Sequence, residues 1–467
     1  MSLIKSISGF RGTIGGEVGN NLTPIDVVSC TAAFGTWVKE NSNHSGVFTV
    51  IIGRDARISG EIVNHLVVST LRSLGINVLD LELSTTPTVE MAVTMQGAQA
   101  GIIITASHNP AQWNALKFLN EKGEFISGAD GNRVLEILAN NAFHFCSVDQ
   151  LGTYKTDNSF IQKHIDAIFA LPLVNVEKVK AKAFKVVVDC INSTGAISIL
   201  PLLEQMGCEV ILINKEMTGQ FAHNPEPLKE HLRELEQSVL NNRANLGIAV
   251  DPDVDRLVFM CEDGELFGEE YTIVALADYI LKHKQGNTVS NLSSTRALRD
   301  VTLKAGGEYF ASAVGEVNVV EMMKAQNAVL GGEGNGGVIY PELHYGRDAL
   351  VGVALMLTYL SDYGFPISFL RRSYPNYQMS KNKISLDPSV DFSKVFVTIQ
   401  SKYKREKIST VDGLKIDFED GWIHLRQSNT EPIIRIYSEA GSQVAADAYA
   451  QKIMRDINEI LKDEKED

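Results

Sequence analysis

The chain has 467 residues, 44% of them hydrophobic and 21% charged, which is typical of a globular protein with several domains. Its formal net charge of −14 argues against nucleic acid and anionic membrane surfaces as partners. The five cysteines are scattered without a C-x-x-C spacing, and no apolar run is long enough for a secretion signal or a membrane span. We therefore expect a cytoplasmic protein with no membrane partner, in which a site for an anionic ligand gathers its cations locally.

The first 150 residues alternate strands and helices. Thr23 and Pro24 suit the N-cap and first position of a helix that ends near residue 40. Strands are predicted at 47–52, 76–83 and 101–104, and helices at 60–74 and 89–95. This alternation predicts a doubly wound sheet with helices on both faces.

A polar segment, Thr105-Ala-Ser-His-Asn-Pro110, follows the third predicted strand directly. Ligands of open α/β sheets bind just beyond the carboxyl ends of strands, so Ser107 and His108 are well placed for chemistry. Taken alone, the segment is more typical of an ordinary turn, and the case for chemistry depends on the rest of the chain. Lys117 begins a further predicted strand, close enough along the chain for its amine to return towards Ser107. Near the N-terminus, the glycine-flanked Arg11 indicates either a turn or an anion-binding arm.

A second α/β unit is predicted after a boundary at 140–157. Its strands are expected at 185–189, 209–213 and 246–250, and its helices at 197–206 and about 226–242. The last strand runs into Asp251-Pro-Asp253-Val-Asp255-Arg256. Alternating carboxylates at a strand end can converge on one hard divalent cation, although solvated acidic turns are common.

A third α/β unit begins near residue 261. Strands are predicted at 288–292, 310–316 and 329–330, with helices at 271–282, 295–305, 317–326 and 347–360. The glycine-rich segment 331–337 contains Glu333 and Asn335. Such a segment is either a flexible turn or a surface that lets a ligand approach the backbone.

The last hundred residues predict a small α+β domain with short strands and one terminal helix, about 443–462. Its distinctive segment, 426–432, is Arg-Gln-Ser-Asn-Thr-Glu-Pro, and Arg435 follows on the strand 433–437. Two arginines, two hydroxyl groups and loop amides favour a phosphate dianion, while a polar hairpin turn is the alternative.

These four segments resemble, in their order, the motifs of the α-D-phosphohexomutase family: the phosphoserine loop at 105–110, the metal loop at 251–256, the sugar-binding loop at 332–337 and the phosphate-binding loop at 426–432. The resemblance covers essentially the whole chain. It implies four domains around a central cleft. Three are related α/β domains with mixed, doubly wound sheets (1–150, 151–260 and 261–370), and the fourth is a smaller C-terminal α+β domain (371–467).

The resemblance also implies residue roles. Ser107 matches the phosphoryl donor and, with Asp251, Asp253 and Asp255, a Mg²⁺ ligand. His108, Lys117 and Arg11 match positions near the phosphoserine, with Lys117 a candidate for proton transfer. The predicted substrate contacts are Glu316, Glu333, Asn335, Arg256 and Arg347, and the predicted phosphate contacts are Arg426, Ser428, Asn429, Thr430 and Arg435.

The implied reaction moves a phosphoryl group between O6 and O1 of a phosphorylated hexose. A bisphosphorylated hexose is the expected intermediate and activator, and the protein is expected to be a monomer or a homodimer. A common family pattern for the sugar loop is Glu-x-Ser-Gly-His, and here Asn335 and Gly337 replace its serine and histidine.

Glu316 stands where some members carry histidine. Two carboxylates facing the sugar favour a 2-ammonium group, so a glucosamine phosphate is the expected substrate, with mannose or glucose phosphates as alternatives. Glu316 could instead stabilise the start of the next helix.

Three other functions compete with the mutase. A metal-dependent sugar phosphatase could use the same aspartates, and a non-catalytic sugar-phosphate binder is conceivable. A serine hydrolase built on Ser107 and His108 is disfavoured because no G-x-S-x-G elbow is present.

Overall fold

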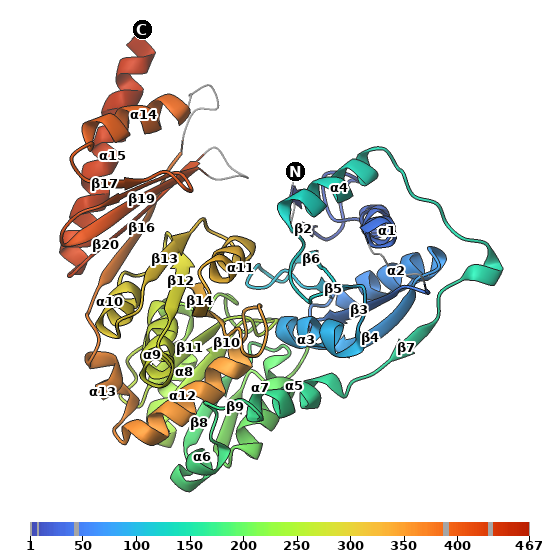
Figure 1. Ribbon diagram of the computed structural model, residues 1–467, viewed down its shortest axis with the longest axis horizontal. Helices are drawn as coiled ribbons and strands as arrows, with labels where there is room; N and C mark the ends of the chain where they lie inside the picture. The colour runs from blue at the N-terminus through green and yellow to red at the C-terminus, as the bar shows by residue number, and fades with distance from the viewer. Residues whose placement is uncertain (1, 7–8, 42–45, 386–391, 428–432, 467) are drawn as a thin grey trace. The chain divides into compact units, whose positions relative to one another are not determined.

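The computed structural model describes residues 2–6, 9–41, 46–385, 392–427 and 433–466. The chain divides into two compact units, residues 1–272 with 335–368 and residues 273–334 with 369–467 (Figure 1). Among the described helices, none is long and apolar enough to cross a membrane.

The first unit begins with a mixed seven-stranded sheet in the order β1-β2-β6-β5-β3-β4-β7. Parallel pairing joins β3 to β4 and β5, while β6 runs antiparallel to both β5 and β2. The strands are β1 (Ile4–Ser6), β2 (Gly9–Thr13), β3 (Thr49–Arg54), β4 (Asn77–Leu83), β5 (Ala100–Ile104), β6 (Trp113–Leu119) and β7 (Tyr154–Thr156).

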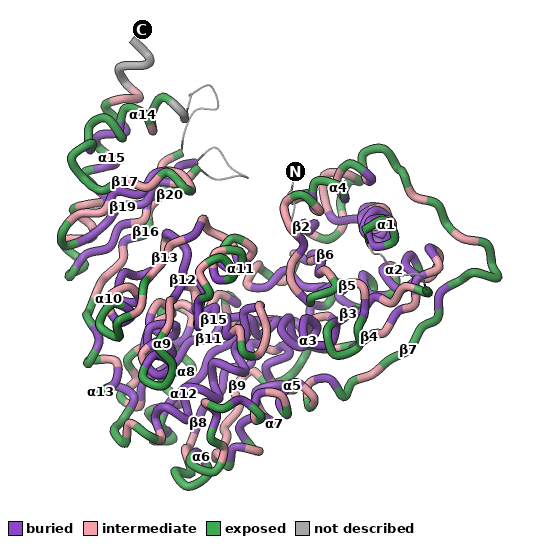
Figure 2. The backbone as a smooth tube through the Cα atoms, in the orientation of Figure 1, coloured by how far each residue is buried: buried purple, intermediate pink, exposed green. Residues whose placement is uncertain are grey.

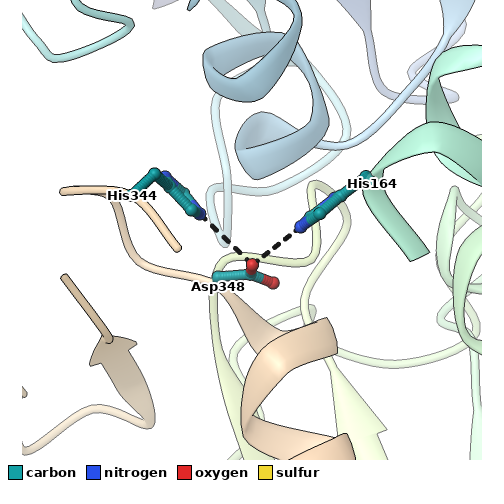
Figure 3. A group of neighbouring side chains, drawn as sticks. All are labelled: His164, His344 and Asp348. Carbon is teal, nitrogen blue, oxygen red and sulfur yellow. Dashed lines mark hydrogen bonds and ion pairs between the residues drawn. The ribbon is translucent and has the colours of Figure 1, made fainter. Parts of the chain in front are cut away.

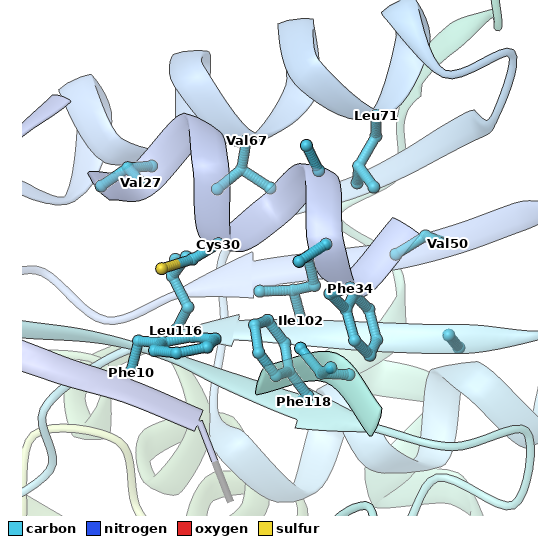
Figure 4. Close-up of a cluster of buried hydrophobic side chains, with 14 of the residues drawn as sticks. Phe10, Val27, Cys30, Phe34, Val50, Val67, Leu71, Ile102, Leu116 and Phe118 are labelled. Carbon is cyan, nitrogen blue, oxygen red and sulfur yellow. The ribbon is translucent and has the colours of Figure 1, made fainter. Parts of the chain in front are cut away.

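Both faces of this sheet are covered because its central strands are apolar throughout. All five residues of β5 are buried (Figure 2). Ile102 and its neighbours pack against one set of helices (Figure 4), whereas Ile51 and Ile103 pack against α3 on the other face. The helices are α1 (Pro24–Asn41), α2 (Gly60–Ser73), α3 (Thr86–Gln96) and α4 (Gly128–Ala139), of which α3 covers the second face.

A second sheet of the first unit has the order β11-β10-β8-β9. Only β11 is antiparallel, because the chain returns directly from β10 through the segment 251–256. The strands are β8 (Lys185–Asp189), β9 (Glu209–Ile213), β10 (Leu246–Val250) and β11 (Leu257–Cys261). The unit also contains α5 (Phe160–Phe169), α6 (Val176–Lys182), α7 (Gly195–Gln205), α8 (Arg233–Asn242), β15 (Gly337–Ile339) and α12 (Ala349–Tyr363). Two short 3₁₀ helices lie at Val148–Gln150 and Lys229–His231.

The second unit combines two sheets. In the first, β12 (Asn287–Asn291) pairs in parallel with β13 (Tyr309–Ser312) and β14 (Ala328–Glu333), near α10 (Ala297–Lys304) and α11 (Glu316–Ala325). The second is an antiparallel sheet in the order β16-β20-β19-β18-β17, with α14 (Phe392–Lys402) and α15 (Gln443–Glu466) packed on its core. Its strands are β16 (Gln378–Ser385), β17 (Lys407–Ser409), β18 (Leu414–Asp417), β19 (Gly421–Gln427) and β20 (Ile433–Ala440). Of the three unit boundaries, two fall within α9 (Glu269–His283) and α13 (Ile367–Arg372), and the third falls between β14 and β15.

The three α/β sheets and the antiparallel sheet of the smaller C-terminal domain confirm the predicted fold class. The domain limits at 150, 260 and 370 stay predictions, and β7, which follows the first of them, pairs with β4. The single central cleft, which would join loops of both units, also stays a prediction.

Two element predictions are wrong. The helix expected at 226–242 begins only at Arg233, because Pro225 and Pro227 disfavour a helical backbone before them. The strand expected at 310–316 ends at Ser312, because the chain turns at Gly315 with φ 113°.

Candidate active site

Ser107 lies in a tight turn directly after β5. Its φ is +47°, a left-handed conformation that costs a non-glycine residue roughly 1–3 kcal/mol. Thr105 stabilises the turn: its hydroxyl accepts from the Ser107 amide at 2.9 Å and donates to Asp55 Oδ2 at 2.6 Å. The strain is therefore held by a buried polar network beneath the serine.

Arg57 braces the same turn from a fully buried position. Its Nε donates to Asp55 Oδ2 at 3.0 Å. Its two terminal nitrogens donate to four carbonyl oxygens of the serine loop, at Ser107, Asn109 (2.7 Å), Pro110 (2.8 Å) and Trp113 (2.9 Å). One guanidinium thus fixes the path of the chain from the serine to the start of β6.

Three buried aspartates follow β10 and face the serine. Asp251 Oδ2 accepts a hydrogen bond from Ser107 Oγ at 2.6 Å, and Asp251 Oδ1 accepts from the amides of Asp255 and Arg256, both at 3.1 Å. One oxygen from each of Asp251, Asp253 and Asp255 lies within 4.8 Å of the others. We call these three residues the aspartate triad.

Cationic side chains surround the triad. Lys117 Nζ lies 2.9 Å from Asp253 Oδ2 and 3.8 Å from Asp255 Oδ2, and Arg347 Nη2 donates to Asp255 Oδ2 at 2.7 Å. Arg256 is less tightly engaged, with Nη1 3.5 Å from Glu226 Oε1. These contacts partly neutralise three carboxylates that have no access to solvent.

The close approach of the three carboxylates and Lys117 shifts the pKa values of three of these groups. Burial, and then the charges of Asp255 and Asp253, raise the pKa of Asp251 well above its usual value. Burial opposes ionisation of Asp253 too, but the Lys117 ammonium lowers the pKa of that carboxyl. Burial favours the neutral amine of Lys117, yet Asp253 and Asp255 outweigh it and raise the pKa of Lys117.

The triad fits a hard divalent cation. The carboxylate oxygens Asp253 Oδ1 and Asp255 Oδ1 are buried and accept no hydrogen bond from any residue that the structure describes. Buried carboxylate oxygens are costly without a partner, and oxygen donors at this spacing are those that Mg²⁺ and Ca²⁺ use. Ser107 Oγ lies beside the same cluster.

His108 and Arg11 both lie near the serine. His108 Nδ1 is 3.4 Å from Ser107 Oγ. Burial, followed by the charges of Arg256 and Arg347, lowers the pKa of His108 to about 2, so its imidazole is neutral at physiological pH. Arg11 lies on β2, not in a turn, and Nη1 donates to Asn109 Oδ1 at 3.2 Å. Six predicted residues of the first unit, namely Arg11, Ser107, His108, Lys117, Arg256 and Arg347, therefore gather with the triad around one point.

The sugar-loop carboxylate lies in the second unit. Glu333 is buried, and its Oε1 accepts from Asn291 Nδ2 at 2.8 Å and from the Gly315 amide at 3.3 Å. Glu316, which follows Gly315 in the chain, is also buried and is the first residue of α11. The two glutamates thus flank one turn, although the position of Glu316 equally suits a helix N-terminus. In the first unit, Asn335 Oδ1 accepts from the Gly337 amide at 3.1 Å.

The predicted phosphate-binding arginines pair directly across β19 and β20. Arg426 is opposite Arg435, and Arg435 is opposite Lys383 on β16, which puts three cations in one row across the sheet. Like charges in register destabilise a sheet unless an anion separates them. Ser428, Asn429 and Thr430 lie outside the described residues.

Asp412 connects the predicted sugar contact and the predicted phosphate contact of the second unit. Its Oδ2 lies 2.9 Å from Arg426 Nε and accepts from the Val314 amide at 3.0 Å. Val314 precedes the Gly315 amide that binds Glu333. A continuous hydrogen-bonded path therefore runs from the carboxylate Glu333 to the guanidinium of Arg426.

Sequence reasoning missed the roles of Asp55, Arg57, Lys383 and Asp412. The segment Gly53-Arg54-Asp55-Ala56-Arg57 follows a predicted strand, and that position was an available signal. The contacts of Lys383 and Asp412 depend on strand register and on residues far along the chain, which no local pattern encodes.

Comparisons with known proteins agree along the whole chain. Four families match, described as phosphoglucomutase/phosphomannomutase alpha/beta/alpha domain I (residues 4–145), domain II (162–264), domain III (268–377) and C-terminal domain (390–456).

Curated relatives and solved structures are similar over nearly their full lengths. A protein of Thermococcus kodakarensis named phosphoglucomutase/phosphomannomutase is 33% identical, covering 97% of this chain and 99% of that protein. A Methanopyrus kandleri protein named probable phosphoglucosamine mutase is 32% identical with the same coverage. The crystal structure of a phosphoglucomutase/phosphomannomutase family protein from Burkholderia thailandensis superposes with a TM-score of 0.84 at 25% identity, covering 98% of this chain and 97% of that one.

Proposed function

The chain belongs to the phosphoglucomutase/phosphomannomutase family, and we propose that it interconverts hexose 6-phosphates and hexose 1-phosphates through a phosphoserine at Ser107. The observation that carries the proposal is the 2.6 Å contact between Ser107 Oγ and Asp251 Oδ2 within the buried triad. A serine that only formed a surface turn would face solvent, whereas Ser107 is buried and bonds to one of three buried carboxylates.

We assign the triad to Mg²⁺. Its donors are all carboxylate oxygens, two of which are buried without a hydrogen bond from the described residues, and such a set favours a hard cation over Zn²⁺. Bound there, Mg²⁺ would neutralise charge on the transferring phosphoryl group. The oxygen of Ser107 would be a further ligand.

In the proposed reaction, the phosphoryl group of phospho-Ser107 passes to the free hydroxyl of the sugar. The bond between phosphorus and Ser107 Oγ breaks, a bond to the sugar oxygen forms, and the proton of the sugar hydroxyl is replaced by one on the freed Ser107 Oγ, with Lys117 as the candidate carrier. The resulting bisphosphorylated hexose turns around and returns its other phosphoryl group to the serine. Arg57 keeps the serine loop fixed throughout, which favours in-line transfer.

Lys117 remains the candidate for proton transfer. Its raised pKa means that it starts as an ammonium ion, which suits protonation of an oxygen rather than removal of a proton. His108, whose imidazole is neutral, lies 3.4 Å from the serine oxygen and suits hydrogen bonding to the phosphoryl group.

The cation row Arg426, Arg435 and Lys383 is assigned to the phosphate that is not reacting. A row of this kind grips a phosphate dianion and makes no contact with the sugar ring, so it accepts the hexose in either orientation. The predicted contacts of Ser428, Asn429 and Thr430 belong to the same assignment.

For the substrate we favour glucosamine phosphate, which would make the chain a phosphoglucosamine mutase. The support is the pair of buried carboxylates, Glu333 and Glu316, on the two sides of the Gly315 turn. Two buried carboxylates carry two negative charges, and an ammonium group compensates one of them whereas a hydroxyl group brings no charge. Phosphomannomutase or phosphoglucomutase activity is the second candidate, since Glu316 also occupies a helix N-terminus.

The mutase is tested by intact-mass measurement and product analysis of the purified protein. We expect the added mass of one phosphoryl group on wild-type protein and none on Ser107→Ala. A bisphosphorylated hexose should increase isomer formation by wild-type protein. Release of inorganic phosphate faster than isomer would identify a phosphatase, and an unmodified, inactive serine would identify a binder.

The substrate assignment is tested with the 6-phosphates of glucosamine, mannose and glucose. We expect the highest kcat/KM for glucosamine 6-phosphate, and we expect Glu316→Gln to reduce that preference. Glu321→Gln is the matched control, because it removes the same charge from an exposed position of the same helix. A preference for mannose or glucose would overturn the substrate assignment, and a preference that survives Glu316→Gln would overturn its electrostatic reason.

A further inference from the structure

A second convergent group of side chains lies in the first unit, and the proposed reaction does not use it. His164 is on α5, while His344 and Asp348 lie in the segment between β15 and α12 (Figure 3). His164 Nε2 lies 2.9 Å from Asp348 Oδ2, and His344 Nε2 lies 3.2 Å from the same oxygen. We call these three residues the histidine cluster.

An oxygen atom lies beside the outer nitrogen of each imidazole. His164 Nδ1 lies 3.0 Å from Thr88 Oγ1, and His344 Nδ1 lies 3.3 Å from Glu90 Oε2. In protein metal sites, a coordinating histidine typically donates its second ring nitrogen to a carboxylate or another oxygen. Both Nε2 atoms are thereby oriented towards the same point.

The two carboxylate oxygens of Asp348 make different contacts. Its Oδ1 accepts from the amides of Leu350 and Val351 at the start of α12, at 2.8 and 3.2 Å. This capping fixes the carboxylate and leaves Oδ2 facing the two histidines. The side chains of His164 and Asp348 are fully buried, and that of His344 is 10% exposed.

The spacing of the three donors suits one small cation. In tetrahedral zinc sites, ligands about 2.0–2.1 Å from the metal lie roughly 3.3 Å from one another. The two distances to Asp348 Oδ2, 2.9 and 3.2 Å, are close to that value, and all three donor atoms lie within 4.8 Å of one another. The three residues can therefore each offer one donor to a single cation.

The charges also favour a divalent cation. Two buried carboxylates, Asp348 and Glu90, face two imidazoles that are neutral when they coordinate through Nε2. Gly346 lets the Glu90 carboxylate approach, because a Cβ at that position would lie 1.8 Å from Glu90 Oε2. A divalent cation would balance both carboxylates in one site.

We propose that His164, His344 and Asp348 bind a borderline divalent transition metal such as Zn²⁺ at a site separate from the aspartate triad. A metal needs the lone pair of both Nε2 atoms, which donate to Asp348 Oδ2 when no metal is bound. On binding, the Nε2 proton of His344 therefore passes to solvent, and that of His164 moves to Nδ1, where Thr88 Oγ1 accepts it. Nitrogen donors select Zn²⁺ over Mg²⁺, whereas the all-oxygen triad does the reverse. Through these ligands the metal would link α5, which carries His164, to the segment that carries His344, Asp348 and Arg347. The guanidinium of Arg347 contacts Asp255. This inference does not depend on the proposed reaction.

Metal content of the full-length protein tests the site. The protein is stripped with a chelator, loaded with Zn²⁺ in excess Mg²⁺, freed of unbound metal by gel filtration and analysed by mass spectrometry. We expect about one zinc per chain in wild-type protein and in the triad variant Asp253→Asn, and at least a tenfold weaker affinity in His344→Gln. His223→Gln is the matched control, because its Nε2 contacts only one carboxylate, Asp189, at 2.9 Å; it should retain the zinc.

X-ray absorption at the zinc edge of wild-type protein provides a readout that needs no variant. Scattering from two imidazole rings supports the histidine cluster. A shell of oxygen ligands only, zinc that is lost in Asp253→Asn, or equal retention by His344→Gln would overturn the proposal.

Discussion

Removal of the Arg57 guanidinium should destabilise the serine loop more than the loss of any exposed ion pair. Arg57→Met keeps an apolar stem of similar length and removes five side-chain hydrogen bonds, one to Asp55 and four to loop carbonyls. Breaking a fully buried ion pair by removing one partner costs about 3–5 kcal/mol, because the other charge stays buried. Burial already raises the pKa of Asp55 although Arg57 opposes that rise, so the orphaned carboxyl would take up a proton more readily.

Urea unfolding followed by tryptophan fluorescence measures this loss, with Trp113 reporting from the end of the loop. Arg133→Met is the control, because Arg133 forms exposed ion pairs with Glu40 at 3.0 Å and Glu136 at 2.8 Å, which contribute little. The double variant Asp55→Asn/Arg57→Met should recover part of the lost stability, since neither charge then remains buried.

The single variant Arg57→Met should lose about a hundredfold or more in kcat, because a displacement of the serine by about 1 Å is enough for such a loss. Arg57→Lys should not rescue it, since one ammonium cannot reach four carbonyl oxygens and a carboxylate. An Arg57→Met protein with the wild-type urea midpoint would refute the energetic reasoning, and wild-type turnover would show that other contacts position the serine.

Four further outcomes are expected. Ser107→Ala should abolish isomerisation with little change in stability, because the side chain lies in a turn and the covalent carrier is lost; residual wild-type turnover would exclude a phosphoserine. Chelation with EDTA should stop the reaction and Mg²⁺ should restore it, whereas full activity in metal-free buffer would contradict the role of the triad. Arg426→Ala should lower kcat/KM for every phosphosugar about ten- to a hundredfold, since a charge-assisted contact contributes roughly 1.5–3 kcal/mol; unchanged values would make the segment a plain hairpin. Burial lowers the pKa of His223, but the Asp189 carboxylate outweighs burial and raises that pKa. The stability that this pair contributes is therefore complete below the pKa of an unfolded histidine and is lost as the pH rises through the pKa of the folded state. His223→Gln should destabilise the protein at pH 5.5 and hardly at pH 9, and an equal loss at both values would be inconsistent with this linkage.

The sequence predicted those parts of the site that follow directly from strand ends. The apolar strands β5 and β10 precede Ser107 and Asp251, and carboxyl ends of parallel strands are where ligands bind. The alternation of Asp251, Asp253 and Asp255 was sufficient to predict convergent oxygens. In these cases, local order along the chain determines the position of the side chain.

Other features depend on contacts that no local pattern encodes. Arg57 donates to carbonyl oxygens about fifty residues away along the chain. Every residue has a backbone carbonyl, so the sequence does not indicate which carbonyls accept these bonds. Lys383 joins Arg435 only through the register of β16 and β20. The histidine cluster joins residues 164 and 344 because α5 packs near the start of α12, and each histidine alone resembles an ordinary buried residue.

The contacts also separate chemistry from recognition. Those described for Ser107, the triad, Lys117 and Arg57 all lie within the first unit, whereas Glu333, Glu316, Asp412 and Arg426 belong to the second. In the proposed mechanism, the groups that act on the transferred phosphoryl group therefore lie in the first unit, and the described groups proposed to bind the non-reacting phosphate and Glu333 of the sugar loop lie in the second. Asp412 contacts both Arg426 and the turn whose Gly315 amide binds Glu333, so we expect Arg426→Ala to disturb the proposed sugar contact as well as the proposed phosphate contact. Such coupling would suit the proposed mutase, because each half-reaction presents the opposite end of the sugar to the same phosphate row.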